Sequence, residues 1–253
     1  MSSKPMPTRT VLVTGGSRGI GAAAALRAAE RGWAVAVNYT SDATAAQAVV
    51  ARIRDAGGMA LAIQADVSIE AAVVELYARV DRELPPLNAL VNNAGVSPKK
   101  PDGSRLNSLE TDIGTWQSMY NTNFYAPLLL TRGFVAELAR AHGAVVNLTS
   151  IAGSRVHPFA GSAYATSKAS LSALTREMAY DLAPVGIRVN AIAPGEIDTA
   201  ILSPRTSEIV ARDIPMRRLG TIEEVADLIW FLCSVQATYI TGAEIPINGG
   251  QHA

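Results

Sequence analysis

The sequence predicts an α/β protein built as one doubly wound parallel sheet of about seven strands, with helices on both faces. Two observations carry this prediction. Short apolar runs alternate with longer, alanine-rich segments of helical period from Thr10 to the end of the chain. Hydrophobic residues make up 49% of the 253 residues and charged residues 17%, which is typical of a globular protein rather than a disordered one.

Strands are expected where short apolar runs are bounded by polar or glycine residues, and helices where apolar positions recur at helical spacing. In chain order, the expected strands are Thr10–Thr14, Ala34–Tyr39, Ala60–Gln64, Ala89–Asn92, Ala144–Thr149, Ile187–Ala193 and Glu244–Ile247. The expected helices are Ile20–Arg31, Ala43–Ala56, Ile69–Glu83, Thr115–Ala141, Ser162–Ala183 and Ile222–Ser234.

The chain is expected to form one domain, because no linker or change in composition divides the alternating series. Residues 1–9 are polar and contain proline, so we expect a flexible N-terminal arm followed by a single domain over residues 10–253. Two long irregular stretches, Ala94–Leu109 and Pro194–Thr221, each follow the carboxyl end of an expected strand. Open α/β sheets bind ligands at that edge.

Composition and charge exclude several classes of function. The 22 Lys and Arg residues balance 22 Asp and Glu residues, so the chain has no excess positive charge for nucleic acid. Cys233 is the only cysteine, which excludes an internal disulfide and favours a reducing compartment and a packed thiol. The chain has no apolar run of about eighteen residues, so we expect a soluble, cytoplasmic protein without a membrane partner. The three histidines are scattered, and no metal site is expected.

A glycine-rich turn joins the first expected strand to the first expected helix. It reads Thr14-Gly15-Gly16-Ser17-Arg18-Gly19-Ile20-Gly21. Glycine permits a tight bend and lets backbone N–H groups approach a pyrophosphate, whose charge the N-terminus of the helix favours. The position of this turn in the alternating series predicts a dinucleotide-binding, Rossmann-type domain.

The same residues also match the nucleophile elbow of serine hydrolases, Gly15-x-Ser17-x-Gly19. A hydrolase with Ser17 as nucleophile would need a histidine and an acid downstream and an oxyanion loop upstream. Only thirteen residues precede Thr14, too few for an earlier strand with such a loop. Dinucleotide binding is therefore the favoured interpretation.

A tyrosine and a lysine, Tyr164 and Lys168, lie four positions apart in an expected helix, so their side chains share one face. Ser150 ends the expected strand fourteen residues upstream of the tyrosine. A phenol with an ordinary pKa near 10 relays protons efficiently only if that pKa falls toward neutrality, which takes roughly 4 kcal/mol for about three units. An ammonium about 4 Å away supplies about that much, so Lys168, alone or with an oxidised nicotinamide ring, is expected to lower the pKa of Tyr164.

Taken together, these residues resemble the short-chain dehydrogenase/reductase family over nearly the whole chain, from about Thr10 to Gly250. The order of the separate matches is more specific than any one of them. The matches are Thr14-Gly15-x-x-x-Gly19-x-Gly21, Asp66, Asn92-Asn93-Ala94-Gly95, Ser150, Tyr164-x-x-x-Lys168 and Pro194-Gly195.

The resemblance implies an enzyme that moves a hydride between NAD(P) and a carbonyl or alcohol group. By the pattern of the family, Tyr164 is the general acid/base and Ser150 binds the same substrate oxygen. Lys168 lowers the pKa of the tyrosine and holds the nicotinamide ribose. Asn123, in Asn121-Thr122-Asn123-Phe124, positions a water between Lys168 and solvent. Asn123 could instead satisfy only the local backbone.

Cofactor contacts are also implied by the resemblance, at the glycine turn and after the later strands. Asp66 and Val67 are expected at the adenine, Asn93 and Gly95 at the adenosine ribose, and Ile197 and Thr199 at the carboxamide. Each has a structural alternative, such as a helix cap for Asp66. The full expected set is Gly15, Ser17, Arg18, Gly19, Ile20, Gly21, Asn38, Tyr39, Thr40, Ser41, Asp66, Val67, Asn93, Ala94, Gly95, Tyr164, Lys168, Pro194, Gly195, Ile197 and Thr199.

NADP is favoured over NAD, because the second expected strand ends without an acid at the position that usually accepts from the ribose hydroxyl. Arg18 can reach a 2′-phosphate, and Asn38, Thr40 and Ser41 can hydrogen-bond to it. Asp42 is the contrary observation, and we interpret it as the N-cap of the following helix.

The substrate is predicted only as a class. The overall likeness favours reduction of a ketone of the 3-oxoacyl type, with a sugar or alcohol dehydrogenase of the same family as the alternative. Lys99, Lys100 and Arg105 could attract an acidic substrate or a phosphorylated carrier, or lie on a solvated surface. Substrate contacts are expected from Val156, His157, Pro158 and Phe159, with a lid from the segment Ala200–Pro215.

A catalytically idle nucleotide-binding protein is a remote alternative. The family also implies a homotetramer, built through Thr115–Ala141, Ser162–Ala183 and the C-terminal segment Ile240–Gly250.

Overall fold

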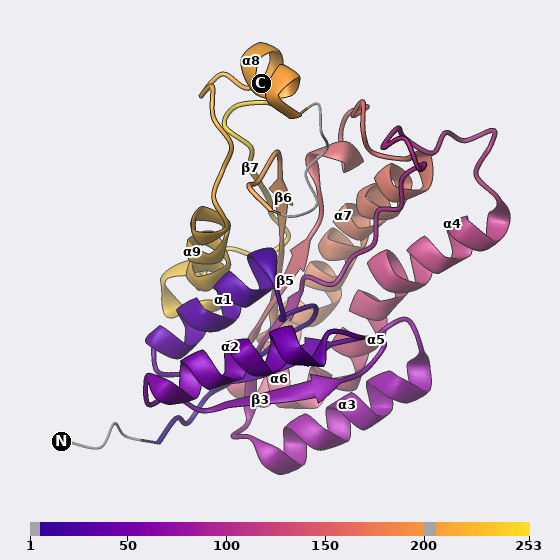
Figure 1. The fold of residues 1–253 in the computed structure, drawn as a ribbon. Helices are drawn as coiled ribbons and strands as arrows, with labels where there is room; N and C mark the ends of the chain where they lie inside the picture. The colour runs from indigo at the N-terminus through magenta and orange to yellow at the C-terminus, as the bar shows by residue number, and fades with distance from the viewer. Residues whose placement is uncertain (1–5, 200–205) are drawn as a thin grey trace.

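A seven-stranded parallel sheet forms the centre of the molecule, in a computed structural model that describes residues 6–199 and 206–253. The strand order is β3-β2-β1-β4-β5-β6-β7, so successive strands are added in one direction as far as β3 and in the opposite direction from β4 onward. This is the predicted single-domain, Rossmann-type doubly wound α/β fold, with helices on both faces (Figure 1). Of the predicted N-terminal arm, only residues 6–9 lie within the described part of the chain.

The strands and helices lie close to their expected positions. The strands are β1 (Thr10–Val13), β2 (Ala34–Tyr39), β3 (Ala60–Gln64), β4 (Leu87–Asn92), β5 (Ala144–Leu148), β6 (Arg188–Pro194) and β7 (Glu244–Ile247). The α-helices are α1 (Gly19–Glu30), α2 (Ala43–Asp55), α3 (Glu70–Glu83), α4 (Ile113–Tyr120), α5 (Ala126–Gly133), α6 (Val135–Ala141), α7 (Ser162–Leu182), α8 (Thr206–Asp213) and α9 (Ile222–Cys233).

Two hydrophobic cores, one on each face, hold the helices to the sheet. Alternate residues of a strand point to opposite faces, so Val11 and Val13 of β1 pack in one core and Leu12 in the other. Helices α1, α2 and α9 cover the first face, and α3, α5, α6 and α7 cover the second. The central strands are buried on both faces, which is why they read as continuous apolar runs in the sequence.

The long helix expected over Thr115–Ala141 is the main difference from the sequence-based assignment. The segment instead consists of α4, a π-helical turn η1 (Asn121–Tyr125), α5 and α6. Pro127 lies in the first turn of α5, where its missing N–H is tolerated. A π-turn inserts an extra residue, and here it contains Asn123, one of the predicted catalytic residues.

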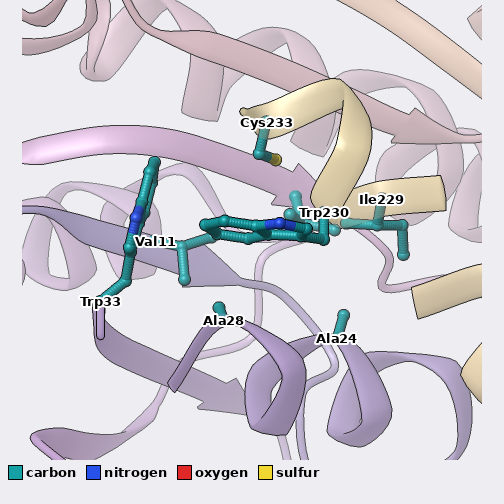
Figure 2. A pocket seen from close by; sticks show the side chains of 8 residues that line it. Val11, Ala24, Ala28, Trp33, Ile229, Trp230 and Cys233 are labelled. Carbon is teal, nitrogen blue, oxygen red and sulfur yellow. The ribbon is translucent and has the colours of Figure 1, made fainter. Parts of the chain in front are cut away.

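The packing of α1 against α9 encloses a small apolar cavity of about 10 Å³. Trp33 and Trp230 meet edge to face beside it, with ring centroids 5.4 Å apart (Figure 2). Its volume holds at most one water molecule, and its lining is apolar, so we assign it to core packing. Cys233 also lines the cavity, and burial raises the pKa of its thiol to about 12. The packed, unreactive thiol predicted from the sequence is confirmed.

Candidate active site

The glycine turn after β1 forms a close-packed cradle at the N-terminus of α1. Gly15 and Gly19 have positive φ angles of 59° and 55°, which glycine adopts without strain. A Cβ on Gly21 would lie 2.3 Å from the carbonyl oxygen of Gly15 and 2.5 Å from Nδ2 of Asn93. The turn therefore has room for backbone alone, and the first backbone N–H groups of α1 are available to an anion. These features fit the pyrophosphate of a dinucleotide.

The segment after β4 fixes this cradle from the neighbouring strand. The Asn93 side chain donates from Nδ2 to the carbonyl oxygens of Thr14 and Gly15, at 2.9 and 3.1 Å. In return, Oγ1 of Thr14 accepts from the backbone N–H groups of Asn93 and Ala94, both at 3.0 Å. Asn93 thus holds the turn in shape, in keeping with its structural alternative, and its contact with the adenosine ribose stays a prediction.

The end of β2 differs in part from the prediction. Asn38 is fully buried, and its Nδ2 donates to the carbonyl oxygens of Ile63 and Ala65 while its Oδ1 accepts from the N–H of Gly15. Because both polar atoms are used inside the protein, Asn38 supports the glycine turn and is not available to a 2′-phosphate. Asp42 caps α2, with Oδ1 2.9 Å from the N–H of Ala45, as predicted.

The remaining residues around the end of β2 stay accessible. Arg18, Thr40 and Ser41 are exposed, whereas Tyr39 is buried. Asp66 accepts from the backbone and hydroxyl of Ser68, which forms a local turn before α3 rather than the N-cap of that helix.

Asn123 and Lys168 are buried side by side beneath the segment after β4. Oδ1 of Asn123 accepts from Val96 N–H, and its Nδ2 donates to the Val96 carbonyl and to Oγ of Ser167, at 2.9–3.0 Å. A Cβ on Gly95 would lie 3.3 Å from Asn123 Oδ1 and 3.4 Å from Lys168 Nζ. The structure thus brings these three predicted residues together, with the Asn123 side chain fully engaged with the protein.

Ser150 and Tyr164 also meet, as the sequence predicted. Ser150 follows β5, and its hydroxyl forms a hydrogen bond with Tyr164 that lowers the pKa of the phenol. Burial has the larger effect and raises that pKa, and the negative charge of Glu196 raises it further. The protein's own groups therefore keep Tyr164 protonated at neutral pH.

The surroundings of Lys168 bear on its predicted effect on the pKa of Tyr164. Its ammonium donates to the Leu148 carbonyl at 2.6 Å and lies 5.9 Å from the centre of the Tyr164 ring. Burial lowers its own pKa to about 8, because a charged ammonium loses hydration there. Burial is the largest effect on the pKa of Tyr164 and raises it, and Lys168 is not among the groups that shift it, so Lys168 by itself does not lower that pKa here. The combined effect of Lys168 and an oxidised nicotinamide ring stays a prediction.

The loop after β6 closes the other side of the site. Ile197 is buried and pairs with Gly220, and Cγ2 of Thr199 lies 3.8 Å from the position of a Cβ on Gly19. The predicted carboxamide contacts thus lie across from the glycine turn. Part of the predicted lid, residues 200–205, lies outside the described residues, and the rest contains helix α8.

One ionisable pair in this region was not predicted. Nε2 of His157 and Oε1 of Glu196 are 2.6 Å apart, and the two side chains are only 10% and 11% exposed. The sequence suggested His157 as a pocket residue, but nothing in the spacing of residues 157 and 196 indicates that they are paired. Of the three predicted loop cations, Lys100 pairs with Glu110, and Arg105 donates to Oγ of Ser162.

The hydrolase alternative lacks a base. His157 pairs with Glu196, His252 pairs with Asn248, and His142 ends α6 beside Gly186, so each histidine lies elsewhere than at Ser17. The described residues also contain no cluster of His, Cys, Asp or Glu side chains that could hold a metal ion. In the same part of the chain, no helix has the length and apolarity to cross a membrane.

The sequence also matches known proteins over almost its full length. The family model described as enoyl-(acyl carrier protein) reductase covers residues 15–252. Protein FixR of Bradyrhizobium diazoefficiens is 52% identical over 96% of this chain and 87% of its own, and the 3-oxoacyl-[acyl-carrier-protein] reductase FabG of Staphylococcus epidermidis is 37% identical over 96% and 99%. This chain is a short-chain dehydrogenase/reductase.

Solved structures agree with this assignment. A 3-oxoacyl-[acyl-carrier protein] reductase from Brucella melitensis with bound NAD has a TM-score of 0.90 and 31% identity, covering 98% of this chain and 92% of that one. A short-chain dehydrogenase from Burkholderia cenocepacia in complex with NADP has a TM-score of 0.89 and 34% identity, covering 99% and 100%. This short-chain dehydrogenase/reductase is accordingly an oxidoreductase that uses a nicotinamide cofactor.

Replacing Gly21 by alanine tests the cradle of this dehydrogenase/reductase. The new methyl group would overlap the Gly15 carbonyl, so we expect the turn to shift and dinucleotide affinity, measured by calorimetry, to fall at least about tenfold. Gly133→Ala is the matched control, since a Cβ there has no atom within 4 Å. Unchanged affinity in a folded Gly21→Ala protein would contradict the cradle.

The burial of Lys168 predicts a pH-dependent difference in stability. The folded-state pKa of about 8 lies below the unfolded value of 10.5, so the buried ammonium destabilises the protein below pH 8, and this cost disappears as pH rises to 10.5. By urea unfolding, wild type should gain roughly 3 kcal/mol relative to Lys168→Met over that window. Lys99→Met serves as the surface control. A difference between wild type and Lys168→Met that does not vary with pH would contradict the prediction.

Proposed function

We propose that this enzyme reduces a ketone with NADPH, with Tyr164 donating the proton to the carbonyl oxygen. The single observation that carries the proposal is the pairing of Tyr164 with Ser150 at the carboxyl end of β5, in surroundings that raise the pKa of the phenol. A phenol that keeps its proton at neutral pH is suited to act as the acid in carbonyl reduction.

Ser150 and Tyr164 would bind the carbonyl oxygen together and stabilise the negative charge that develops there. When bound, the reduced nicotinamide supplies the hydride. Lys168 is suited to hold the ribose of the cofactor, because its ammonium lies beside Gly95 and is fixed by the Leu148 carbonyl. Asn123 contributes by positioning: its side chain joins the segment after β4 to α7 through Val96 and Ser167.

The preference for NADP rests on the end of β2. Asp42, the acid in that region, is engaged as the cap of α2, and Arg18, Thr40 and Ser41 are exposed beside it. An exposed guanidinium and two hydroxyl groups suit a phosphate better than a free ribose hydroxyl. The remaining predicted cofactor contacts, including Ser17, Ile20, Val67 and Pro194, belong to the same proposal.

Ketones of the 3-oxoacyl type are the first substrates to test, because relatives such as FabG of Staphylococcus epidermidis are named for that reaction. Sugar or alcohol oxidation is the second candidate, and the polar His157–Glu196 pair beside the site favours it. The homotetramer and the cytoplasmic location stay predictions. The homotetramer is supported by tyrosines such as Tyr180 of α7 and Tyr239, which are 83% and 102% exposed.

Replacing Tyr164 by phenylalanine removes the proposed acid and keeps the ring. We expect kcat for ketone reduction to fall by about 10²–10⁴, with NADPH affinity within about twofold, because proton transfer contributes on that scale. Consumption of NADPH followed by absorbance measures the rate. Tyr77→Phe, which removes a phenol hydroxyl that donates to Glu137 between α3 and α6, is the control. Undiminished turnover would refute the role, and a wild type that binds NADPH but reduces nothing would indicate an idle binder.

Replacing Arg18 by alanine tests the cofactor preference. Removal of the guanidinium should weaken NADPH binding by about tenfold and leave NADH binding nearly unchanged, because only NADPH carries the 2′-phosphate. Arg52→Ala, an exposed change on α2, controls for loss of surface charge. Titration of wild type with both cofactors completes the test, and tighter binding of NADH would overturn the preference.

A further inference from the structure

The proposed mechanism leaves one buried ionisable pair unused. His157 and Glu196 form a 2.6 Å hydrogen bond and are almost entirely shielded from solvent. Burying a carboxylate costs free energy unless it is partnered, and apolar side chains of similar size would fill the same space more cheaply. Such a pair beside a catalytic site therefore suggests a role in recognition.

The pair bridges the two loops that flank the proposed acid. His157 lies between Ser150 and Tyr164, in the segment that joins β5 to α7. Glu196 lies two residues beyond the end of β6, which is paired with β5. Both strands end at the same edge of the sheet, so the pair lies over that edge, and the charge of Glu196 acts on the Tyr164 hydroxyl. The pair is thus positioned on the substrate side of the site.

Two hydrogen bonds hold the imidazole of His157 in place. Nδ1 of His157 accepts from the backbone N–H of Phe159 at 3.3 Å. Nε2 lies 2.6 Å from Oε1 of Glu196. The imidazole thereby fixes the carboxylate of Glu196, whose negative charge raises the pKa of Tyr164. The pair therefore presents an anionic hydrogen-bond acceptor to its surroundings.

Further polar groups surround the pair. Asp213, the last residue of α8, and Arg155 lie near the pair. The charges of Arg155 and His157 both lower the pKa of Asp213. Arg155 donates to the carbonyl oxygen of Gln251, in the C-terminal segment. A Cβ on Gly195, next to Glu196, would lie 2.9 Å from Oε1 of Gln251, a buried atom with no hydrogen-bond partner among the described residues. The hydrogen-bond acceptors near the pair therefore include Oε1 of Gln251 as well as the carboxylate of Glu196.

We infer that the His157–Glu196 pair is the specificity-determining wall of the substrate cleft, and that it selects ketones with a hydrogen-bond donor, a hydroxyl or an amine, next to the carbonyl. This inference rests on the proposed ketone reduction and narrows its substrate. Carboxylates are disfavoured by repulsion, and plain aliphatic ketones or acyl chains by the cost of covering a buried carboxylate without a new hydrogen bond.

The expected discrimination is moderate to large. A hydrogen bond to a charged group contributes more than one between neutral groups, and a site built around such a group rejects substrates that leave it unpaired. Substrates that place a donor against Glu196 should be preferred about ten- to a hundredfold in kcat/KM over matched substrates that lack the donor. His157 contributes by holding the carboxylate in place.

A series of small ketones of similar size tests the inference on the wild-type enzyme. Hydroxyacetone carries a hydroxyl, aminoacetone an ammonium, pyruvate a carboxylate, and butanone none of these groups. With NADPH, we expect kcat/KM to fall from hydroxyacetone and aminoacetone to butanone, and to be lowest for pyruvate. The first two compounds separate a hydroxyl from an amine. Equal values for hydroxyacetone and butanone would overturn the inference while leaving ketone reduction in place.

Two variants test whether the preference for donor-bearing ketones depends on the His157–Glu196 pair. In Glu196→Gln, the ratio of kcat/KM for hydroxyacetone to that for butanone should fall about tenfold and the relative value for pyruvate should rise. His157→Asn should lower the same ratio less. Glu83→Gln, which neutralises an exposed carboxylate on α3, is the matched control and should leave the ratio unchanged. A wild-type preference that persists in Glu196→Gln would overturn the inference. Failure of the wild type to reduce any ketone would instead overturn the proposed function.

Discussion

The site depends on one constraint of parallel sheets: the strands end at the same edge, where their last backbone groups still need hydrogen-bond partners. In this protein, side chains from neighbouring strands satisfy those groups. Asn93 donates to the carbonyl oxygens of Thr14 and Gly15, and Oδ1 of Asn38 accepts from the N–H of Gly15. The glycine turn, the asparagine segment after β4 and the end of β2 are thereby fixed as one unit before any cofactor is considered.

A second chain of buried polar side chains positions the helix that carries the proposed catalytic residues. Asn92 of β4 donates to Asn147 of β5, which donates to Thr175 of α7, at 2.8 and 2.9 Å. These bonds tie two central strands to the helix that carries Tyr164 and Lys168. Because the atoms joined by these two bonds are buried and would be costly to leave unpaired, the bonds fix the position of α7 on the sheet. The proposed proton donor, Tyr164, is therefore held by the interior of the protein rather than by a mobile loop.

Burial, more than any single charge, sets the electrostatics of the site. It raises the pKa of Tyr164 and lowers that of Lys168, so both groups move toward their uncharged forms. The negative charge of Glu196 acts in the same direction on the phenol. This unfavourable interaction is understandable if the carboxylate serves the substrate, because the loop after β6 then provides selectivity while helix α7 provides the proton donor.

The sequence by itself determined the fold and the strand positions, because hydrophobic periodicity and glycine spacing are local properties of the chain. Its resemblance to the short-chain dehydrogenase/reductases indicated Tyr164, Ser150, Lys168 and Asn123 as candidate site residues, and the structure brings these residues together. Only the tertiary structure decided that Asn38 is used inside the protein and that the expected long helix breaks at the π-turn. It also decided that His157 meets Glu196. Pairing, burial and pKa depend on neighbours that are distant in sequence, and no local pattern encodes them.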